Sequence, residues 1–222
     1  MNKLTIVLIV LMATACETSK DNNVDQSTIE TLPYYEEATF TPQWFSSREE
    51  MPEKFHHIPK FSVVNQLGDA ITEEVFDNKI SIVNFFFTTC PGICPKMMAN
   101  MDLVQKQLRE KKQLQLLSYS VTPEMDGVSE LKEYAEKNEI PSEGWYLLTG
   151  NREVIYDLGR NQFFVEEDMG LEKRPDDFLH TENILLIDGE RHIRGIYNGL
   201  NKTAINQMIA DVETLQAEML AH

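Results

Sequence analysis

The sequence predicts an α/β fold in which a mixed central sheet is flanked by helices. The apolar run from Ile80 to Phe87 fits a strand that is buried on both faces. From Cys94 onward the apolar residues recur with helical spacing, and residues 114–120 form a second apolar strand. A strand, a helix and a strand in this order predict a β–α–β unit with a parallel pair of strands.

The other elements follow in chain order from their periodicity and turn residues. Ahead of the unit, residues 61–72 with a turn at 66–69 predict an N-terminal hairpin extension. Behind it come a helix near 128–138, a strand at 145–148, a helix near 154–158, a polar insertion at 166–177, a hairpin of 184–187 with 192–197, and a last amphipathic helix. With a cysteine pair at the turn of the β–α–β unit, this order is the thioredoxin-like arrangement.

The N-terminus has the pattern of a bacterial lipoprotein signal. Met1-Asn2-Lys3 precedes an apolar run, Leu4 to Ala13, that is too short to span a bilayer as a permanent helix. Small residues then lead directly to Cys16, as in a lipobox whose cysteine carries the lipid. A conventional cleavage site beside an incidental cysteine is the alternative. A lipidated Cys16 would place the protein on a membrane of the cell envelope, facing the periplasm.

These patterns divide the chain into three parts. We expect a signal peptide at 1–15, a flexible polar tether at 16–45 and the thioredoxin-like domain at 46–222. The formal net charge of −16 argues against a nucleic-acid partner, whose phosphates require a basic face. The simplest interpretation of this charge is a soluble surface that repels itself.

If Cys16 carries a lipid, Cys90 and Cys94 remain as an isolated pair outside the cytoplasm. Cys90 is expected near a helix N-terminus, where the dipole and free N–H groups favour a thiolate. The two sulfurs could close a disulfide or hold one metal ion. Soft thiolates select Cu(I) or Zn(II), and a metal site needs a further ligand. Met97 and Met101 recur at helical spacing, which favours core positions over thioether ligation.

A third ligand must come from a distant part of the chain. His180 precedes the strand at 184–187, in the loop that faces the cysteine turn in thioredoxin-like folds. Oxidoreductases of this fold usually have a cis-proline there. From the residues alone, a ligand role and a structural role stay equally open for His180. His56, His57 and His192 read as surface residues, and His222 is terminal.

In these motifs the chain resembles the Sco/SenC family of thioredoxin-like copper chaperones, which take part in the assembly of the Cu-A centre of cytochrome c oxidase. The resemblance covers residues 50 to 215. It rests on Phe87-Thr88-Thr89-Cys90-Pro91-Gly92-Ile93-Cys94-Pro95, Leu148-Thr149-Gly150, His180-Thr181 and Arg194-Gly195-Ile196-Tyr197-Asn198-Gly199. It implies Cys90, Cys94 and His180 as ligands of copper, as Cu(I) with Cu(II) also open. It also implies an oxidase subunit carrying the Cu-A site as partner, with another copper or thiol partner protein as the alternative.

The chain departs from the family pattern at two positions near these motifs. Thr122 stands where the family often has an acid, although Asp126, four residues later, is retained. Leu179 stands before His180 where the family often has Asp, which removes a hydrogen bond that could orient the imidazole. Asp126 itself could either begin the following helix or act at the site.

The sequence is compatible with three functions. The first is a membrane-tethered copper chaperone that transfers copper by ligand exchange. The second is a thiol–disulfide oxidoreductase in which Cys90 attacks a partner's disulfide and Cys94 resolves the mixed disulfide. The third is a redox or copper sensor. His180, and the absence of proline beside it, favour a metallochaperone over an enzyme.

Overall fold

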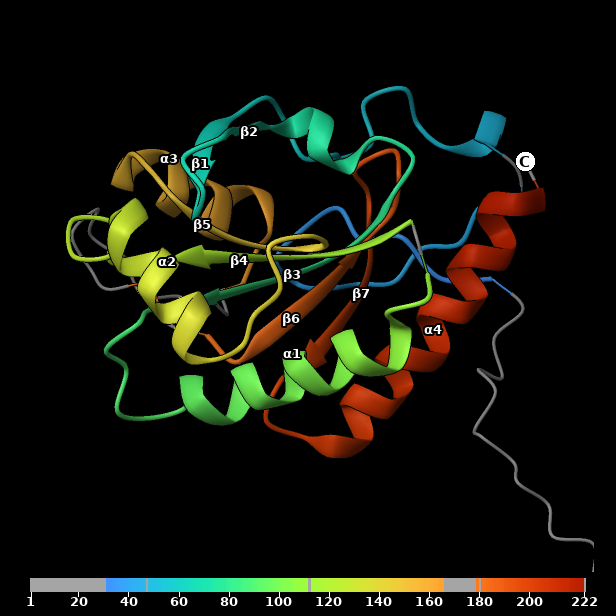
Figure 1. Ribbon diagram of the computed structural model, residues 1–222. Helices are drawn as coiled ribbons and strands as arrows, with labels where there is room; N and C mark the ends of the chain where they lie inside the picture. The colour runs from blue at the N-terminus through green and yellow to red at the C-terminus, as the bar shows by residue number, and fades with distance from the viewer. Residues whose placement is uncertain (1–30, 47, 112, 166–178, 180, 222) are drawn as a thin grey trace, which may run out of the picture.

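The computed structural model describes residues 31–46, 48–111, 113–165, 179 and 181–221 (Figure 1). They form a seven-stranded sheet in the order β2-β1-β5-β4-β3-β6-β7. The strands are β1 Ser62–Asn65, β2 Ala70–Thr72, β3 Ile80–Phe86, β4 Leu114–Ser120, β5 Trp145–Thr149, β6 Asn183–Ile187 and β7 Ile193–Asn198. The helices are η1 Arg48–Glu50, η2 Glu73–Phe76, α1 Cys94–Leu108, α2 Val128–Lys137, α3 Arg152–Asp157, η3 Leu158–Gln162 and α4 Lys202–Ala221.

The predicted β–α–β unit is confirmed at the centre of the sheet. β3 and β4 pair in parallel from Ile80↔Leu114 to Phe86↔Ser120, with α1 as the crossover. β5 continues the parallel part, whereas β6 and β7 on one side and β1 and β2 on the other are antiparallel. The sheet is therefore mixed, with the predicted hairpins at both of its edges.

Two apolar layers bury the sheet, one on each face. Ile82 and Phe86 of β3 point into the layer formed with α1, α2 and α4, and Val83 and Phe85 point into the layer formed with η2, α3 and η3. This alternation follows from the two-residue period of a strand, and every residue of β3 is buried because both layers need apolar side chains. Met97 and Met101 are fully buried in the first layer, as their spacing predicted.

The N-terminal segment corrects one expectation from the sequence. Residues 31–45 were expected to belong to a flexible tether, but Leu32 is only 2% exposed and the backbone N–H of Tyr35 donates to the Ile193 carbonyl of β7. The segment lies on the domain because its apolar and aromatic side chains find a place on the sheet edge. Within the parts of the chain that the structure describes, no helix is sufficiently long and apolar to span a membrane.

The two ends of the sheet differ in the loops that they carry. The C-terminal ends of β3 and β4 lead to the cysteine loop and to the loop at 121–127, and we call this the cysteine end. Ser81, Ile187 and Ile193 are paired across the opposite end, which we call the far end. α4 begins just after β7 at the cysteine end and runs toward the far end (Figure 1).

Candidate functional site

The cysteine pair lies at the junction of a strand and a helix, as the sequence predicted. β3 ends at Phe86, and α1 begins at Cys94 with a proline in its first turn. Both cysteines are free thiols, with Cys94 buried and Cys90 partly exposed. The Cys90 N–H donates to the Phe87 carbonyl at 3.3 Å, which folds the loop back toward the strand. Cys90 is therefore the more accessible of the two thiols.

The two thiols differ in acidity because their surroundings differ. Burial alone would raise the pKa of Cys90, but hydrogen bonds from the Cys94 thiol and from the backbone N–H groups of 92–94 outweigh it and lower the pKa. These N–H groups belong to the loop and first turn that begin α1, where donors lack helical partners. Burial, together with the hydrogen bond to Cys90, raises the pKa of Cys94 to about 12. Cys90 is therefore the thiol that ionises first.

Asp126 supports the cysteine loop from beneath. Its carboxylate is 1% exposed and accepts hydrogen bonds from the Thr88 backbone N–H at 3.1 Å and the Thr88 hydroxyl at 2.5 Å. The hydroxyls of Ser120 and Thr122 donate to the same carboxylate at 2.6 and 3.0 Å. Thr122, the departure from the family pattern, is thus a hydrogen-bond donor to the acid that remains.

This arrangement decides between the two roles that the sequence left open for Asp126. α2 begins at Val128 with Gly127 as its N-cap, and no side chain caps it. Asp126 therefore does not begin the helix but joins the end of β4 to the residue two positions before Cys90. The sequence signal for this role was the retained Asp126 in the motif at 122–127. Its hydrogen-bond partners Thr88 and Ser120 lie 38 and six residues away in the chain, so the motif alone does not reveal them.

A cavity of about 340 Å³ opens beside the two thiols, between α1 and α2. Cys90 and Cys94 line it together with Met98, Tyr134 and Trp145. The Met98 sulfur is oriented by the buried Asn84 amide, which donates to it at 3.6 Å. Burial raises the pKa of Tyr134 to about 12, with the two cysteines adding to the shift, so the phenol remains protonated at neutral pH. The cavity gives an incoming group access to both sulfurs.

His180 and Cys16, two of the predicted site residues, lie outside the described residues. The residues next to His180 are fixed on both sides. Leu179 is fully buried against Gly159, where a Cβ would meet its Cδ1 atom at 2.9 Å, and the Thr181 hydroxyl accepts from the Asn183 N–H at 3.0 Å. Leu179 has this apolar contact where the family often has an acid.

Among the described residues, no group of three or more histidines, cysteines or carboxylates is placed to hold a metal ion. His56 and His192 are engaged elsewhere: His192 Nδ1 donates to the His56 carbonyl at 2.8 Å, and His56 Nε2 donates to the Gln162 carbonyl at 2.8 Å. His192, expected on the surface, is only 4% exposed and packs edge-on against Tyr34 and Phe55. Its strand is covered by the N-terminal segment, which the sequence pattern of β7 cannot reveal.

Two free, unequal thiols at the first strand–helix junction of this sheet define the class of thioredoxin-like thiol proteins. The family model described as SCO1/SenC matches residues 49–217. The chain belongs to the SCO1/SenC family, and it is related to cytochrome c oxidase assembly proteins.

Three solved structures illustrate the relationship. A SCO1/SenC family lipoprotein from Bacillus anthracis is 29% identical with a TM-score of 0.63, covering 72% of this chain and 95% of its own. BsSco, a member of the Sco family of cytochrome c oxidase assembly proteins, is 28% identical with a TM-score of 0.62, covering 73% and 94%. Yeast Sco1, solved with copper bound, is 25% identical with a TM-score of 0.56, covering 75% and 94%. Sco homologues are thus copper-binding proteins.

Proposed function

We propose that this protein is a membrane-tethered copper chaperone that binds copper through Cys90, Cys94 and His180 and delivers it to the Cu-A site of cytochrome c oxidase. The observation that carries the proposal is the contact between the two free thiols at the start of α1. Two sulfurs held together and reached from a cavity suit a soft ion such as Cu(I). The copper-bound Sco structures of relatives support the choice of metal.

The unequal thiols suit transfer as well as binding. Cys90, whose pKa is lowered, gives up its proton to an arriving metal ion more readily than Cys94, which loses its own proton when the ion binds. Copper then leaves by exchange, as thiolates of the partner replace those of the pair one at a time. The open, partly exposed position of Cys90 favours its exchange before that of Cys94.

An anaerobic Cu(I) titration of the reduced full-length chain tests the proposal. We expect one ion per chain, and a loss of affinity of about tenfold or more in each of Cys90→Ser, Cys94→Ser and His180→Ala. His57→Ala is the matched control, because His57 is exposed and contacts His192 rather than the cysteine loop. Unchanged affinity in both cysteine variants would contradict the proposed site.

The unequal pKa values also support a second function, reduction of a partner's disulfide. The Cys90 thiolate would attack one sulfur of that disulfide and release the other as a thiol after protonation. Cys94 would then lose its proton and attack Cys90, which frees the partner's second thiol and leaves a Cys90–Cys94 disulfide. Two electrons pass to the partner, and an external thiol reductant must restore the pair.

The His180→Ala variant separates the two functions. In this variant the proposed copper site loses one of its three ligands, whereas disulfide exchange needs only the cysteine pair and access to it. We therefore expect weak Cu(I) binding together with reversible formation of the Cys90–Cys94 disulfide in this variant. Unchanged copper affinity with collapse of disulfide reduction would favour the reductase instead.

A further inference from the structure

Residues 31–46 form a strap along the outer edge of the sheet. Tyr34 and Gln43 exchange backbone hydrogen bonds at 2.8 and 3.0 Å, which closes the strap into a small antiparallel loop. The Tyr35 N–H donates to the Ile193 carbonyl at 3.1 Å, so the strap pairs with β7 at the far end. Since β7 is the edge strand, the strap covers backbone groups that would otherwise be open to another chain.

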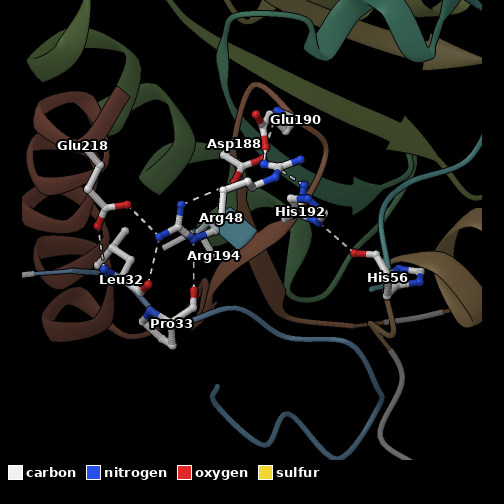
Figure 2. Close-up of polar contacts among 9 residues, drawn as sticks. All are labelled: Leu32, Pro33, Arg48, His56, Asp188, Glu190, His192, Arg194 and Glu218. Carbon is white, nitrogen blue, oxygen red and sulfur yellow. Dashed lines mark hydrogen bonds and ion pairs between the residues drawn. The ribbon is translucent and has the colours of Figure 1, made fainter. Parts of the chain in front are cut away.

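A buried arginine fastens the start of this strap (Figure 2). Arg194 of β7 donates from Nε to the Pro33 carbonyl at 3.1 Å and from a terminal nitrogen to the Leu32 carbonyl at 2.8 Å. The same guanidinium contacts the carboxylates of Asp188 at 3.3 Å and Glu218 at 2.6 Å. We call these contacts the Arg194 clamp.

The clamp joins three parts of the chain that are far apart in sequence. Glu218, near the end of α4, also accepts from the Leu32 N–H at 2.6 Å, so one carboxylate holds both the arginine and the strap. The Tyr34 ring lies 3.9 Å from the guanidinium carbon, on the face not used for hydrogen bonds. The Arg194 side chain is 4% exposed. A guanidinium charge buried to this extent depends on all of these partners, because removing one carboxylate leaves part of the buried positive charge uncompensated.

The clamp lies at the far end of the sheet. Arg194 follows Ile193, which pairs with Ile187, and Ile187 in turn pairs with Ser81 at the start of β3. Cys90 follows the other end of β3, seven residues long, so the clamp and the thiols are separated by on the order of 20 Å or more. The described chain thus begins at the end of the domain opposite the cysteine pair (Figure 1).

We propose that the Arg194 clamp gives the domain a preferred orientation on its membrane, with the far end toward the lipid and the cysteine pair on the opposite side. This inference rests on the lipid anchor at Cys16 that forms part of the proposed function. With the strap clamped, the connection to the anchor leaves from the far end. The expected tether at 16–30 connects the anchor to the strap in both states, so the clamp keeps the far end nearer the lipid on average. Release of the strap adds residues 31–46 to this connection and weakens that preference.

The first test measures the clamp itself by hydrogen exchange of the full chain. Glu218→Ala removes a carboxylate from the clamp while leaving Arg194 paired with Asp188. We expect the Leu32 and Tyr35 amides to exchange faster by about tenfold or more, the effect of losing a charge-assisted hydrogen bond. Glu213→Ala is the matched control, since Glu213 lies on the same helix and pairs with Lys111, away from the strap. Unchanged exchange at both amides in Glu218→Ala would overturn the clamp.

The second test measures orientation on phosphatidylcholine vesicles that carry a lipid-linked energy acceptor. One protein has a donor dye on Cys90 in the Cys94→Ser background. The other has the dye on Leu220→Cys, with both cysteines of the pair replaced by serine; Leu220 is exposed near the end of α4. We expect stronger energy transfer from position 220 than from position 90, and a smaller difference after Glu218→Ala but not Glu213→Ala.

Equal transfer from the two positions in the protein with an intact clamp would overturn the orientation. Failure of the full chain to float with the vesicles would also overturn it, because its premise of an anchor would be wrong. Neither result touches the copper site, which the titration in solution tests separately. A difference between the positions that disappears only in Glu218→Ala supports the clamp as its cause.

Discussion

Asp126 anchors the loop that carries Cys90 through its hydrogen bonds with Thr88. Its buried carboxylate accepts from the Thr88 backbone and hydroxyl, from Ser120 and from Thr122. Hydrogen bonds to a charged group are stronger than neutral ones, and four of them hold one loop to the end of β4. The carboxylate thus acts through the loop, without a contact to either sulfur among its hydrogen bonds.

Asp126→Asn should destabilise the domain and weaken copper binding together. The amide nitrogen must face hydroxyl and N–H donors, so we expect a loss of about 1.5–3 kcal/mol in the free energy of unfolding. Urea unfolding and Cu(I) titration measure the two effects. Glu110→Gln is the control, because Glu110 is exposed, pairs with Arg109 at 3.2 Å outside the lining of the cavity, and such exposed pairs contribute only about 0.2–1 kcal/mol. Asp126→Asn behaving like the control would show that the loop holds its position without this carboxylate.

The two thiols should react at different rates with an alkylating reagent. Cys90 is more exposed and has the lower pKa, while burial raises the pKa of Cys94 to about 12. In metal-free, reduced protein at neutral pH, we expect iodoacetamide to modify Cys90 first, because the thiolate is the nucleophile. Peptide mass spectrometry after short reaction times gives the order. Equal modification of both residues at early times would contradict the assignment of Cys90 as the reactive thiol.

At the scale of elements, the turn between β6 and β7 contains a buried imidazole that should make stability depend on pH. Burial lowers the pKa of His192; Arg48 and His57 add to this effect, and Asp188 opposes it. The unfolded chain therefore binds a proton at a higher pH than the folded chain does. Stability contributed by neutral His192 is present above the unfolded pKa of about 6.5 and is lost as the pH falls below it.

Urea unfolding at about pH 7.5 and 5.5 should show this loss as a lower midpoint at the acidic pH. Carboxylates also titrate in an acidic chain, so the comparison that isolates His192 is with His192→Gln. The glutamine amide can still donate to the His56 carbonyl, which His192 Nδ1 contacts at 2.8 Å. We expect a smaller change of midpoint with pH in this variant. The same change as in the wild type would exclude His192 as its source.

The contact between η3 and the chain before β6 gives a second test at this scale. A Cβ on Gly159 would meet Leu179 Cδ1 at 2.9 Å and Phe85 Cε1 at 3.2 Å. Gly159→Ala should therefore cost about 1–3 kcal/mol of stability, as overpacking does. It should also weaken Cu(I) binding, because Leu179 precedes the proposed ligand His180. Gly92→Ala is the control for stability, since nothing lies within 4 Å of a Cβ there.

At the scale of the whole molecule, the thiols and the start of the described chain lie at opposite ends of the sheet. This polarity arises because β6 runs antiparallel to β3 and ends at the far end, where β7 begins with Ile193 and Arg194. α4 then runs back along the molecule and brings Glu218 to the same place. In a chain anchored at its N-terminus, the connection to the anchor would therefore leave from the far end, opposite the cysteine end.

Cys16→Ser tests the anchor that this arrangement presupposes. Without the lipid-bearing thiol, we expect the protein to leave the membrane fraction, or to remain as an unprocessed precursor. Cell fractionation with immunodetection and mass measurement of the N-terminus distinguish the products. Correctly processed Cys16→Ser protein that stays fully membrane-bound would show that another feature attaches it.

The sequence by itself determined the features that depend on local pattern. A continuous apolar run predicted β3 as a buried strand, a helical period predicted a helix from Cys94, and their order placed the cysteine pair at a strand–helix junction. Cys90 near a helix N-terminus was expected to favour the thiolate, and the lowered pKa of Cys90 agrees. These features follow from neighbours in the chain, which a sequence displays directly.

Only the tertiary structure decided which buried polar groups are partners. Arg194 and the Leu32 carbonyl are 162 residues apart, and Thr88 and Asp126 are 38 apart, so no local pattern links them. Residues 31–45 were predicted as part of a tether because the stretch from 17 to 45 as a whole is polar and shows no regular pattern, yet a buried guanidinium and a sheet edge hold them on the domain. His192 was expected on the surface because it lies in a hairpin whose pattern looks exposed, yet it is buried. A buried charge or imidazole is stable only where distant segments supply its hydrogen bonds, and the folded chain alone brings those segments together.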